Sequence, residues 1–251
     1  MVKYHSEFKE NLQNINRLVK TPNLMQELIL ENLKNFDKSD FKERQTQKFS
    51  QLIQSIENIS QDSLKESYTL IYNQSCVLAV SALSAIIEKY FVNFTTSNWK
   101  RFKNNPKKIN LSLEELGKYN LNLNNALGRI IMDKDNSIKF QDLQSTIRTF
   151  HNYFNRKIEL DYKLMGNIIF YQQCRHVIVH KESIVDEEFL SRVSDFNLKT
   201  YVLGDRIKLE LQDWLNIQKY FPLLLEIIVP KPALLEGWDG KTYYLDQDFK
   251  A

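Results

Sequence analysis

Glycine and proline are scarce in this chain, and apolar residues recur at steps of three and four through most of it. Only 6 glycines and 5 prolines occur among 251 residues. Because these two residues are the strongest helix breakers, their scarcity and the helical period together predict a mostly helical protein. Apolar residues make up 43% of the chain, which is enough for a full hydrophobic core. We therefore expect an all-α fold.

Local signals place the expected helices along the chain. Thr21 followed by Pro22 has the pattern of an N-cap and a first helical residue. Ser63 and Glu66 form a capping-box pattern, which predicts that the longest helix opens there and ends near residue 94. Ser112 and Glu115 repeat this pattern before a short helix. The remaining helices are expected over residues 22–36, 41–59, 140–154, 161–180, 186–193 and 212–229.

One segment follows the period of a strand instead. Tyr201, Leu203, Ile207, Leu209 and Leu211 alternate with polar residues around a Gly-Asp pair. This alternation predicts one small β-hairpin near residues 199–211. We divide the chain into an N-terminal helical extension (1–62), a main helical domain (63–230) and a C-terminal tail (231–251).

Charge and cysteine content exclude several functional classes. The formal net charge of +3 is too small to indicate nucleic-acid binding without local clustering. Cys76 and Cys174 lie far apart, so neither a disulfide framework nor a cysteine zinc site is indicated. The N-terminus lacks the unbroken apolar segment of a signal peptide. The longest apolar run, residues 221–229, contains Pro222 and Glu226 and is too short to cross a bilayer. We expect a soluble cytoplasmic protein with no membrane segment.

The longest predicted helix carries two different stripes. One is apolar and is typical of a core face: Val80, Leu83, Ile87, Tyr90 and Phe94. The other has the same spacing but is polar: Ser81, Ser84 and Glu88. A polar stripe on an apolar helix is expected to face water, a partner or a site.

The segment QQCRHVIVHKES, residues 172–183, combines Arg175, His176 and His180 at the end of a predicted core helix. A histidine exchanges protons near neutral pH, and the forked arginine guanidinium suits a phosphate group. The spacing of the arginine and the second histidine is weak evidence by itself. The helical context adds to it, because LAVSALSAIIEKYF and FQDLQSTIRTFHNYF predict two helices upstream, and KESIVDEEFL predicts a new helix after a break.

In this context RHVIVH resembles the motif of the HEPN superfamily, which comprises all-helical domains of toxin, CRISPR-associated and phage-defence ribonucleases. The predicted hairpin and final helix are similar to those of its RiboL-PSP-HEPN-like groups. The resemblance covers residues 64–229 and implies a HEPN-like helical bundle (63–230) with extra N-terminal helices. The first 60 or so residues carry no such resemblance.

The resemblance implies a metal-independent endoribonuclease that uses no cofactor and leaves a 2′,3′-cyclic phosphate. It assigns catalysis to Arg175 and His180, with His176 beside them. Glu88 lies where many family members carry an acidic residue on the facing helix, and Ser84 shares its stripe as a second auxiliary residue. The implied partners are an RNA substrate, a second copy of the chain that completes a composite site, and an antitoxin or defence-system protein.

A basic run follows the long helix in a predicted loop, residues 96–110. It contains Lys100, Arg101, Lys103, Lys107 and Lys108, interleaved with Trp99 and Phe102. Such a run can follow an RNA backbone and stack bases on its aromatic rings. A solvated loop without any such role is the commoner case.

The motif residues also have purely structural interpretations. His180 can interact with the dipole of the helix end, and Arg175 can pair with Glu182 or Asp186. His176 and His180 share a helix face and can bind zinc, although no third ligand is evident.

Two further residues near the motif have structural interpretations of the same kind. Glu88 can pair with a lysine on the surface. Cys174 is expected to be a small buried residue and no nucleophile.

Two other functional classes remain open. One is a catalytically silent HEPN module that binds RNA or scaffolds a partner, and the other is a helical interaction protein whose motif is a coincidence. A silent copy has no chemical reason to retain both Arg175 and His180, which favours the ribonuclease.

Overall fold

The computed structural model describes residues 2–34, 61–98, 111–118, 123–196, 198–230, 233–236 and 242–245. These residues are mostly helical, which confirms the predicted all-α class. The helices are α1 Val2–Lys34, α3 Gln61–Ser97, α4 Leu113–Lys118, α5 Leu123–Lys134, α6 Leu143–Phe154, α7 Tyr162–His180, α8 Glu187–Val193 and α9 Leu211–Ile228. A short 3-10 helix, Ser194–Phe196, follows α8. The strands β1 Ala233–Glu236 and β2 Thr242–Leu245 pair antiparallel within the segment expected to be a tail.

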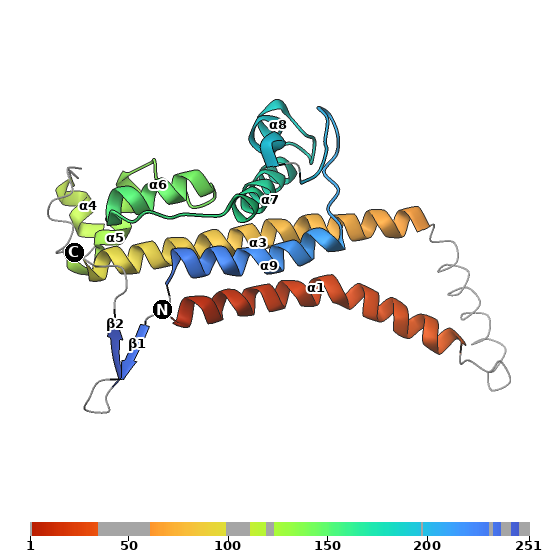
Figure 1. The fold of residues 1–251 in the computed structure, drawn as a ribbon, viewed down its shortest axis with the longest axis horizontal. Coiled ribbons are helices and arrows are strands. Elements are labelled where there is room, and N and C mark those ends of the chain that lie inside the picture. The colour runs from red at the N-terminus through yellow and green to blue at the C-terminus, as the bar shows by residue number, and fades with distance from the viewer. Residues whose placement is uncertain are drawn as a thin grey trace.

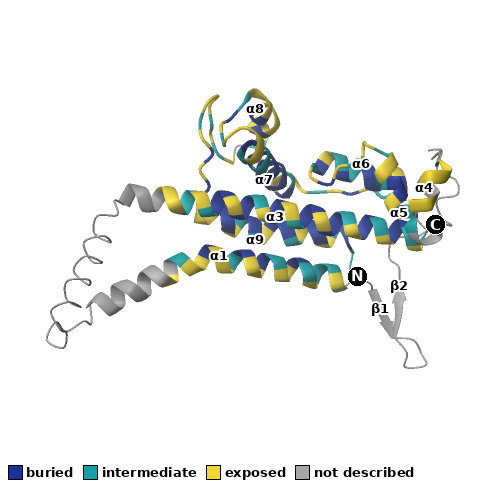
Figure 2. Ribbon diagram, turned by 180° about the vertical axis from the view of Figure 1, so that it is seen from behind, coloured by how far each residue is buried: buried dark blue, intermediate teal, exposed yellow. Residues whose placement is uncertain are grey.

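Helix α3 lies at the centre of the fold and contacts α1, α5, α7 and α9 (Figure 1). In the same view α9 and α1 lie along one side of α3, and α5, α6 and α7 lie along the other. The predicted apolar stripe of α3 is buried throughout, and each of its members is at most 8% exposed. Figure 2 shows this buried face along α3 and α9. The core prediction for this helix is therefore confirmed.

The prediction that a helix begins at Pro22 is wrong. Helix α1 continues through Pro22, and Figure 1 shows the helix bent along its length. Proline lacks an N–H and bends a helix that contains it. The Thr21 hydroxyl donates a hydrogen bond to the Arg17 carbonyl at 2.7 Å. Four buried side chains at helical spacing precede this point: Phe8, Leu12, Ile15 and Val19. Their tertiary packing overrides the local capping signal.

Polar contacts also hold α1 against the other helices. The Trp214 indole N–H donates to the Asn16 side-chain oxygen at 3.0 Å, and His5 Nε2 lies 2.7 Å from the Val229 carbonyl oxygen. Lys89 on α3 pairs with Glu7 at 2.7 Å. The buried side chains of α1 belong to the same core cluster as those of α3, α6, α7 and α9.

The other helix predictions have mixed outcomes. Ser63 lies inside α3, which begins at Gln61, whereas α4 begins directly after Ser112 as expected. Helix α5 was not predicted, and it packs closely on α3 because Gly128 has no side chain. A Cβ there would lie 2.2 Å from the Val92 carbonyl oxygen. The helix expected over residues 41–59 lies outside the described residues.

Three aspartates set the starts of the helices that build the candidate site. Asp142, Asp161 and Asp186 cap α6, α7 and α8, and each carboxylate accepts a hydrogen bond from a backbone N–H in the first helical turn. Such caps satisfy amide groups that have no partner within the helix. The predicted starts of α7 and α8 agree with these caps, and α6 begins three residues later than expected, at Leu143.

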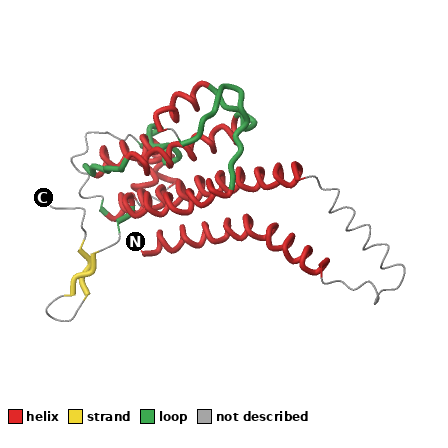
Figure 3. Tube along the Cα trace, turned by 45° about the vertical axis from the view of Figure 1, so that its right-hand side comes forward, coloured by secondary structure: helices red, strands yellow, loops and turns green. Residues whose placement is uncertain are grey.

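The predicted hairpin near residues 199–211 is wrong, because no strand forms there. A turn does occur at Gly204, whose φ is +88°. Ile207 and Leu209 are buried, whereas Leu203 and Leu211 of the same alternation are exposed. The backbone pairs elsewhere, however. Val185 N–H donates to the Asp205 carbonyl at 2.8 Å, and Ile207 N–H donates to the Ser183 carbonyl at 2.8 Å. Residues 183–185, which follow α7, therefore pair with residues 204–207 and take the place of the first hairpin strand; Figure 3 draws this region as loop.

By length and composition alone, Glu66–Ser97 of α3 is the one helix among the described residues that is long and apolar enough to cross a membrane. A core helix meets the same test, and 56% of the tested stretch is buried inside the protein. The expectation of a protein without a membrane segment stays a prediction.

Candidate functional site

The motif lies at the C-terminal end of α7, where the backbone turns sharply. His180 is the last residue of the helix. Glu182 and Ser183 then adopt left-handed conformations with φ of 53° and 67°. Lys181 N–H and Ser183 N–H both donate to the Val177 carbonyl, at 3.0 and 3.1 Å. These bonds close the last turn of α7 and fix the position of the histidine on it.

Arg175 and His180 contact one another. Arg175 Nη1 lies 3.4 Å from His180 Nε2. Because a guanidinium only donates hydrogen bonds, this contact needs an unprotonated Nε2, the state in which histidine can accept a proton. His180 is exposed to solvent and Arg175 is partly buried. The pair therefore combines a fixed cation with an accessible imidazole.

Arg175 has no ion-pair partner among the residues that the structure describes. Asp186, one of the two partners suggested for Arg175, instead caps α8, and its Oδ2 atom lies 3.8 Å from Lys181 Nζ. The Arg175 Nε atom is buried and has no hydrogen-bond partner in the described part of the chain. A buried donor without a partner is costly, so this guanidinium is suited to an anionic ligand that approaches from outside.

His176 lies on the same face of α7 as His180, and their ring centroids are 5.1 Å apart. No third zinc ligand lies beside these two histidines among the described residues, which contain no group of three His, Cys, Asp or Glu that could hold a metal ion. His180 also ends a helix, so the structural interpretation, an interaction with the helix dipole, applies to its position as well.

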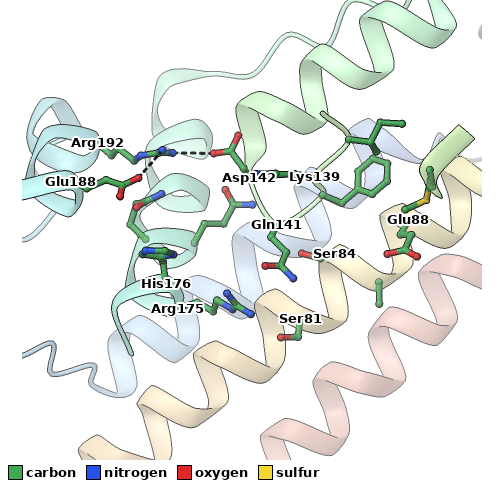
Figure 4. Close-up of a pocket in the computed structure, with 16 residues that line it drawn as sticks. Ser81, Ser84, Glu88, Lys139, Gln141, Asp142, Arg175, His176, Glu188 and Arg192 are labelled. Carbon is green, nitrogen blue, oxygen red and sulfur yellow. Dashed lines mark hydrogen bonds and ion pairs between the residues drawn. The ribbon is translucent and has the colours of Figure 1, made fainter. Parts of the chain in front are cut away.

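A pocket of about 580 Å³ opens beside the motif, between α3, α7, α8 and the segment that leads into α6 (Figure 4). Its polar lining consists of Ser81, Ser84, Glu88, Lys139, Gln141, Asp142, Gln172, Gln173, Arg175, His176, Glu188 and Arg192. Its apolar lining consists of Ala85, Met132, Ile138 and Phe140. The volume lies within the range of about 300–1,000 Å³ that is typical of small-molecule sites.

An ion-pair network connects α8 to the start of α6 at the rim of this pocket. Arg192 lies 3.1 Å from an Asp142 carboxylate oxygen and 2.9 Å from a Glu188 carboxylate oxygen. Figure 4 shows both contacts as dashed lines. The charge of Arg192 is therefore neutralised by two carboxylates of the protein, whereas Arg175 has no ion pair within the described residues. The pocket also contains as many acidic as basic side chains, three of each: Glu88, Asp142 and Glu188 against Lys139, Arg175 and Arg192.

The auxiliary residues lie in the pocket but do not contact the motif. Glu88 is at the opposite end from Arg175 and His176, and it pairs with Arg129 at 3.3 Å (Figure 4). Ser84 is buried and donates to the Val80 carbonyl at 2.9 Å. The polar stripe of α3 therefore faces the pocket, while the expected support of the motif by Glu88 is not present. The basic run from Lys100 to Lys108 lies outside the described residues.

Sequence reasoning missed Gln172 and Gln173, which line the pocket although both are more than nine-tenths buried. The Gln172 side-chain oxygen accepts the Leu143 N–H at 3.0 Å and so holds α6 against α7. Two adjacent glutamines that directly follow the apolar stretch of residues 168–171 are the sequence feature that could have identified them. Asp142 and Arg192 carried no comparable signal, because they lie 50 residues apart along the chain.

Cys174 precedes Arg175 but is fully buried. Burial raises the pKa of its thiol well above the usual value, and the nearby Cys76 and Asp213 raise it further. A thiol in this state is a poor nucleophile. These surroundings agree with its interpretation as a small core residue.

Comparison with known proteins gives no match to a family model, to a curated protein or to a solved structure. The HEPN resemblance rests on the motif and on the helices around it.

Proposed function

We propose that this protein is a metal-independent endoribonuclease of the HEPN type. The observation that supports this best is the contact between Arg175 and His180 beside a pocket, since the guanidinium has no ion pair within the described residues. An unneutralised arginine and an accessible histidine are the two groups that phosphodiester transesterification needs, namely a stabiliser of phosphate charge and a proton carrier.

The proposed reaction needs no water and no metal ion. A ribose 2′-oxygen attacks the adjacent phosphorus, the bond to the 5′-oxygen breaks, and the products are a 2′,3′-cyclic phosphate and a 5′-hydroxyl. His180 accepts the proton of the 2′-hydroxyl through Nε2, or donates a proton to the leaving 5′-oxygen. Arg175 binds the nonbridging phosphate oxygens, whose negative charge increases in the transition state. His176 lies near enough to His180 to influence its orientation.

Metal independence is tested directly by cleavage in the presence of a chelator. We expect the purified chain to cut mixed cellular RNA in EDTA at the rate seen without it, because acid, base and cation all come from side chains. Product ends should carry a cyclic phosphate, identified by mass spectrometry. Activity that disappears in EDTA and returns with a divalent ion contradicts the mechanism. RNA binding without any cleavage would favour the silent HEPN module instead.

We propose further that two chains combine their motifs in a homodimer. The reaction requires a base for the 2′-hydroxyl and an acid for the leaving 5′-oxygen. A two-fold axis near the end of α7 would bring a second His180 to the scissile phosphate, so that each histidine serves one of these roles. His180 is exposed, which allows such an approach. The proposed enzyme acts on cytoplasmic RNA as a toxin or phage-defence effector, with an antitoxin or defence-system protein as its partner.

The composite site predicts that activity depends on protein concentration. Below the dissociation constant of the dimer, measured by mass photometry, we expect turnover per chain to fall and to recover when the sample is concentrated. The control keeps the protein concentration above this dissociation constant and lowers only the RNA concentration. It shows whether the fall in turnover comes from dissociation of the dimer or from loss of protein on the walls of the tube. Undiminished turnover by monomers means that one chain carries a complete site.

A further inference from the structure

Gln173 is the polar group of the pocket that the proposed chemistry does not use. Its side chain lies on α7, is only 8% exposed and lines the pocket. It makes no hydrogen bond with any residue that the structure describes, whereas the neighbouring Gln172 is held by Leu143 N–H. The amide atoms of Gln173 are not among the fully buried atoms that lack a partner in the described part of the chain, so they are open to the pocket. This amide is therefore available to a ligand in the pocket.

The pocket that Gln173 lines is suited to a partly apolar ligand. Met132 and Ile138 are partly buried and supply apolar surface on the pocket wall, whereas the Phe140 ring is buried against Phe91 and Phe150. Arg175 lies two residues further along α7 and lines the same pocket. A ligand in this pocket can therefore contact both the Gln173 amide and Arg175, the side chain proposed to hold the scissile phosphate. A nucleobase attached to that phosphate is a partly apolar ligand of this kind, and proteins commonly bind single-stranded bases through stacking and edge hydrogen bonds.

We propose that this pocket binds one unpaired adenine of the RNA substrate and that Gln173 reads its edge. The proposal rests on the proposed ribonuclease function, because it assigns a base specificity to the same site. The Gln173 amide donates one hydrogen bond to a ring nitrogen of adenine and accepts another from the 6-amino group. Gln173 is a specificity residue in this scheme and takes no part in bond cleavage.

Adenine is the base that a glutamine amide contacts bidentately in protein–nucleic acid complexes, through the amino group and an adjacent ring nitrogen. The carboxylates of the pocket do not decide this preference, because Asp142 and Glu188 are paired with Arg192 and Glu88 is paired with Arg129.

The test is binding of the full chain to uncleavable RNA, so that its result does not depend on catalysis. Fluorescence anisotropy would compare labelled 2′-O-methyl decamers of A, C, G and U. We expect the A decamer to bind about tenfold more tightly than the others, the size of one bidentate base contact. Equal affinity for the four decamers, or no binding, overturns the proposal. So does adenosine monophosphate that binds as tightly as the A decamer, because the ligand is then the free nucleotide.

Two variants of Gln173 sharpen the result. Gln173→Ala should abolish the preference for A. Gln173→Glu replaces a donor and acceptor with two acceptors, which match the two adjacent donors of guanine, so the preference should move from A to G. Gln144→Glu is the matched control, because it adds the same charge on an exposed residue outside the pocket lining. Unchanged preference in both Gln173 variants overturns the role of the amide.

Binding and cleavage together separate this proposal from the function on which it rests. A wild-type chain that prefers A but never cuts RNA contradicts the ribonuclease and supports the adenine pocket. A chain that cuts RNA through Arg175 and His180, yet binds the four decamers equally, contradicts the pocket and leaves the ribonuclease in place.

Discussion

His180→Ala and Arg175→Ala are each expected to lower RNA cleavage by about 10²- to 10⁴-fold, the usual contribution of one acid–base group. His180→Ala removes the proton carrier. Arg175→Ala removes a cation that binds the phosphate oxygens, and Arg175→Lys should recover only part of the rate because it lacks the forked geometry. His176→Ala should lower the cleavage rate by less than either of these two substitutions. Initial rates on a labelled RNA measure these effects.

The alanine variants should fold normally. Apart from its contact with His180, Arg175 makes no hydrogen bond or ion pair within the described residues, and His180 is exposed, so the changes remove only this contact and the ring contact between His176 and His180. Thermal unfolding by circular dichroism checks this point. The matched controls are Arg148→Ala and His151→Ala, which alter exposed residues of α6 outside the pocket lining and should keep wild-type rates. Near-normal cleavage by both motif variants would assign the motif a purely structural role.

A single 2′-deoxy substitution is expected to abolish cleavage at the substituted linkage. The 2′-hydroxyl is the attacking group in the proposed reaction, so the linkage that lacks it has no nucleophile. Neighbouring ribose linkages in the same oligonucleotide should still be cut, and they serve as the internal control. The measurement is the product ladder of an end-labelled RNA on a denaturing gel.

The opposite result would identify a different nucleophile. If the substituted linkage is cut as fast as its neighbours, water attacks the phosphorus and the product is a linear phosphate. Retention of activity on single-stranded DNA would lead to the same conclusion. Either outcome would also remove the need for His180 to act on a 2′-hydroxyl.

Much of the helical architecture follows from the sequence alone, because it depends on local periodicity. The buried stripe of α3 and the ends of α7 and α8 agree with the predictions. Apolar residues at helical spacing must share one face, whatever packs against it. The position of Arg175 and His180 near a helix end was also predictable, since the apolar run is followed by a break and a new predicted helix.

Local signals were wrong where tertiary contacts compete with them. Pro22 did not begin a helix, because the buried face of α1 extends on its N-terminal side and packs on α3 and α9. The alternating segment around Gly204 formed no hairpin, because residues 183–185 supplied its backbone partners. In both cases the competing interaction comes from residues distant in sequence, which no local pattern contains.

The sequence by itself determined the helical class, the main buried faces and the presence of an arginine and a histidine at the end of α7. Only the tertiary structure decided what surrounds that pair. It brought α3, α7, α8 and the start of α6 around one pocket, placed Gln173 in it without a protein partner, and joined Arg192 to Asp142. It also separated Glu88 from the motif. These relations depend on how helices pack in space, and helical periodicity fixes which face is buried but not which helix covers it.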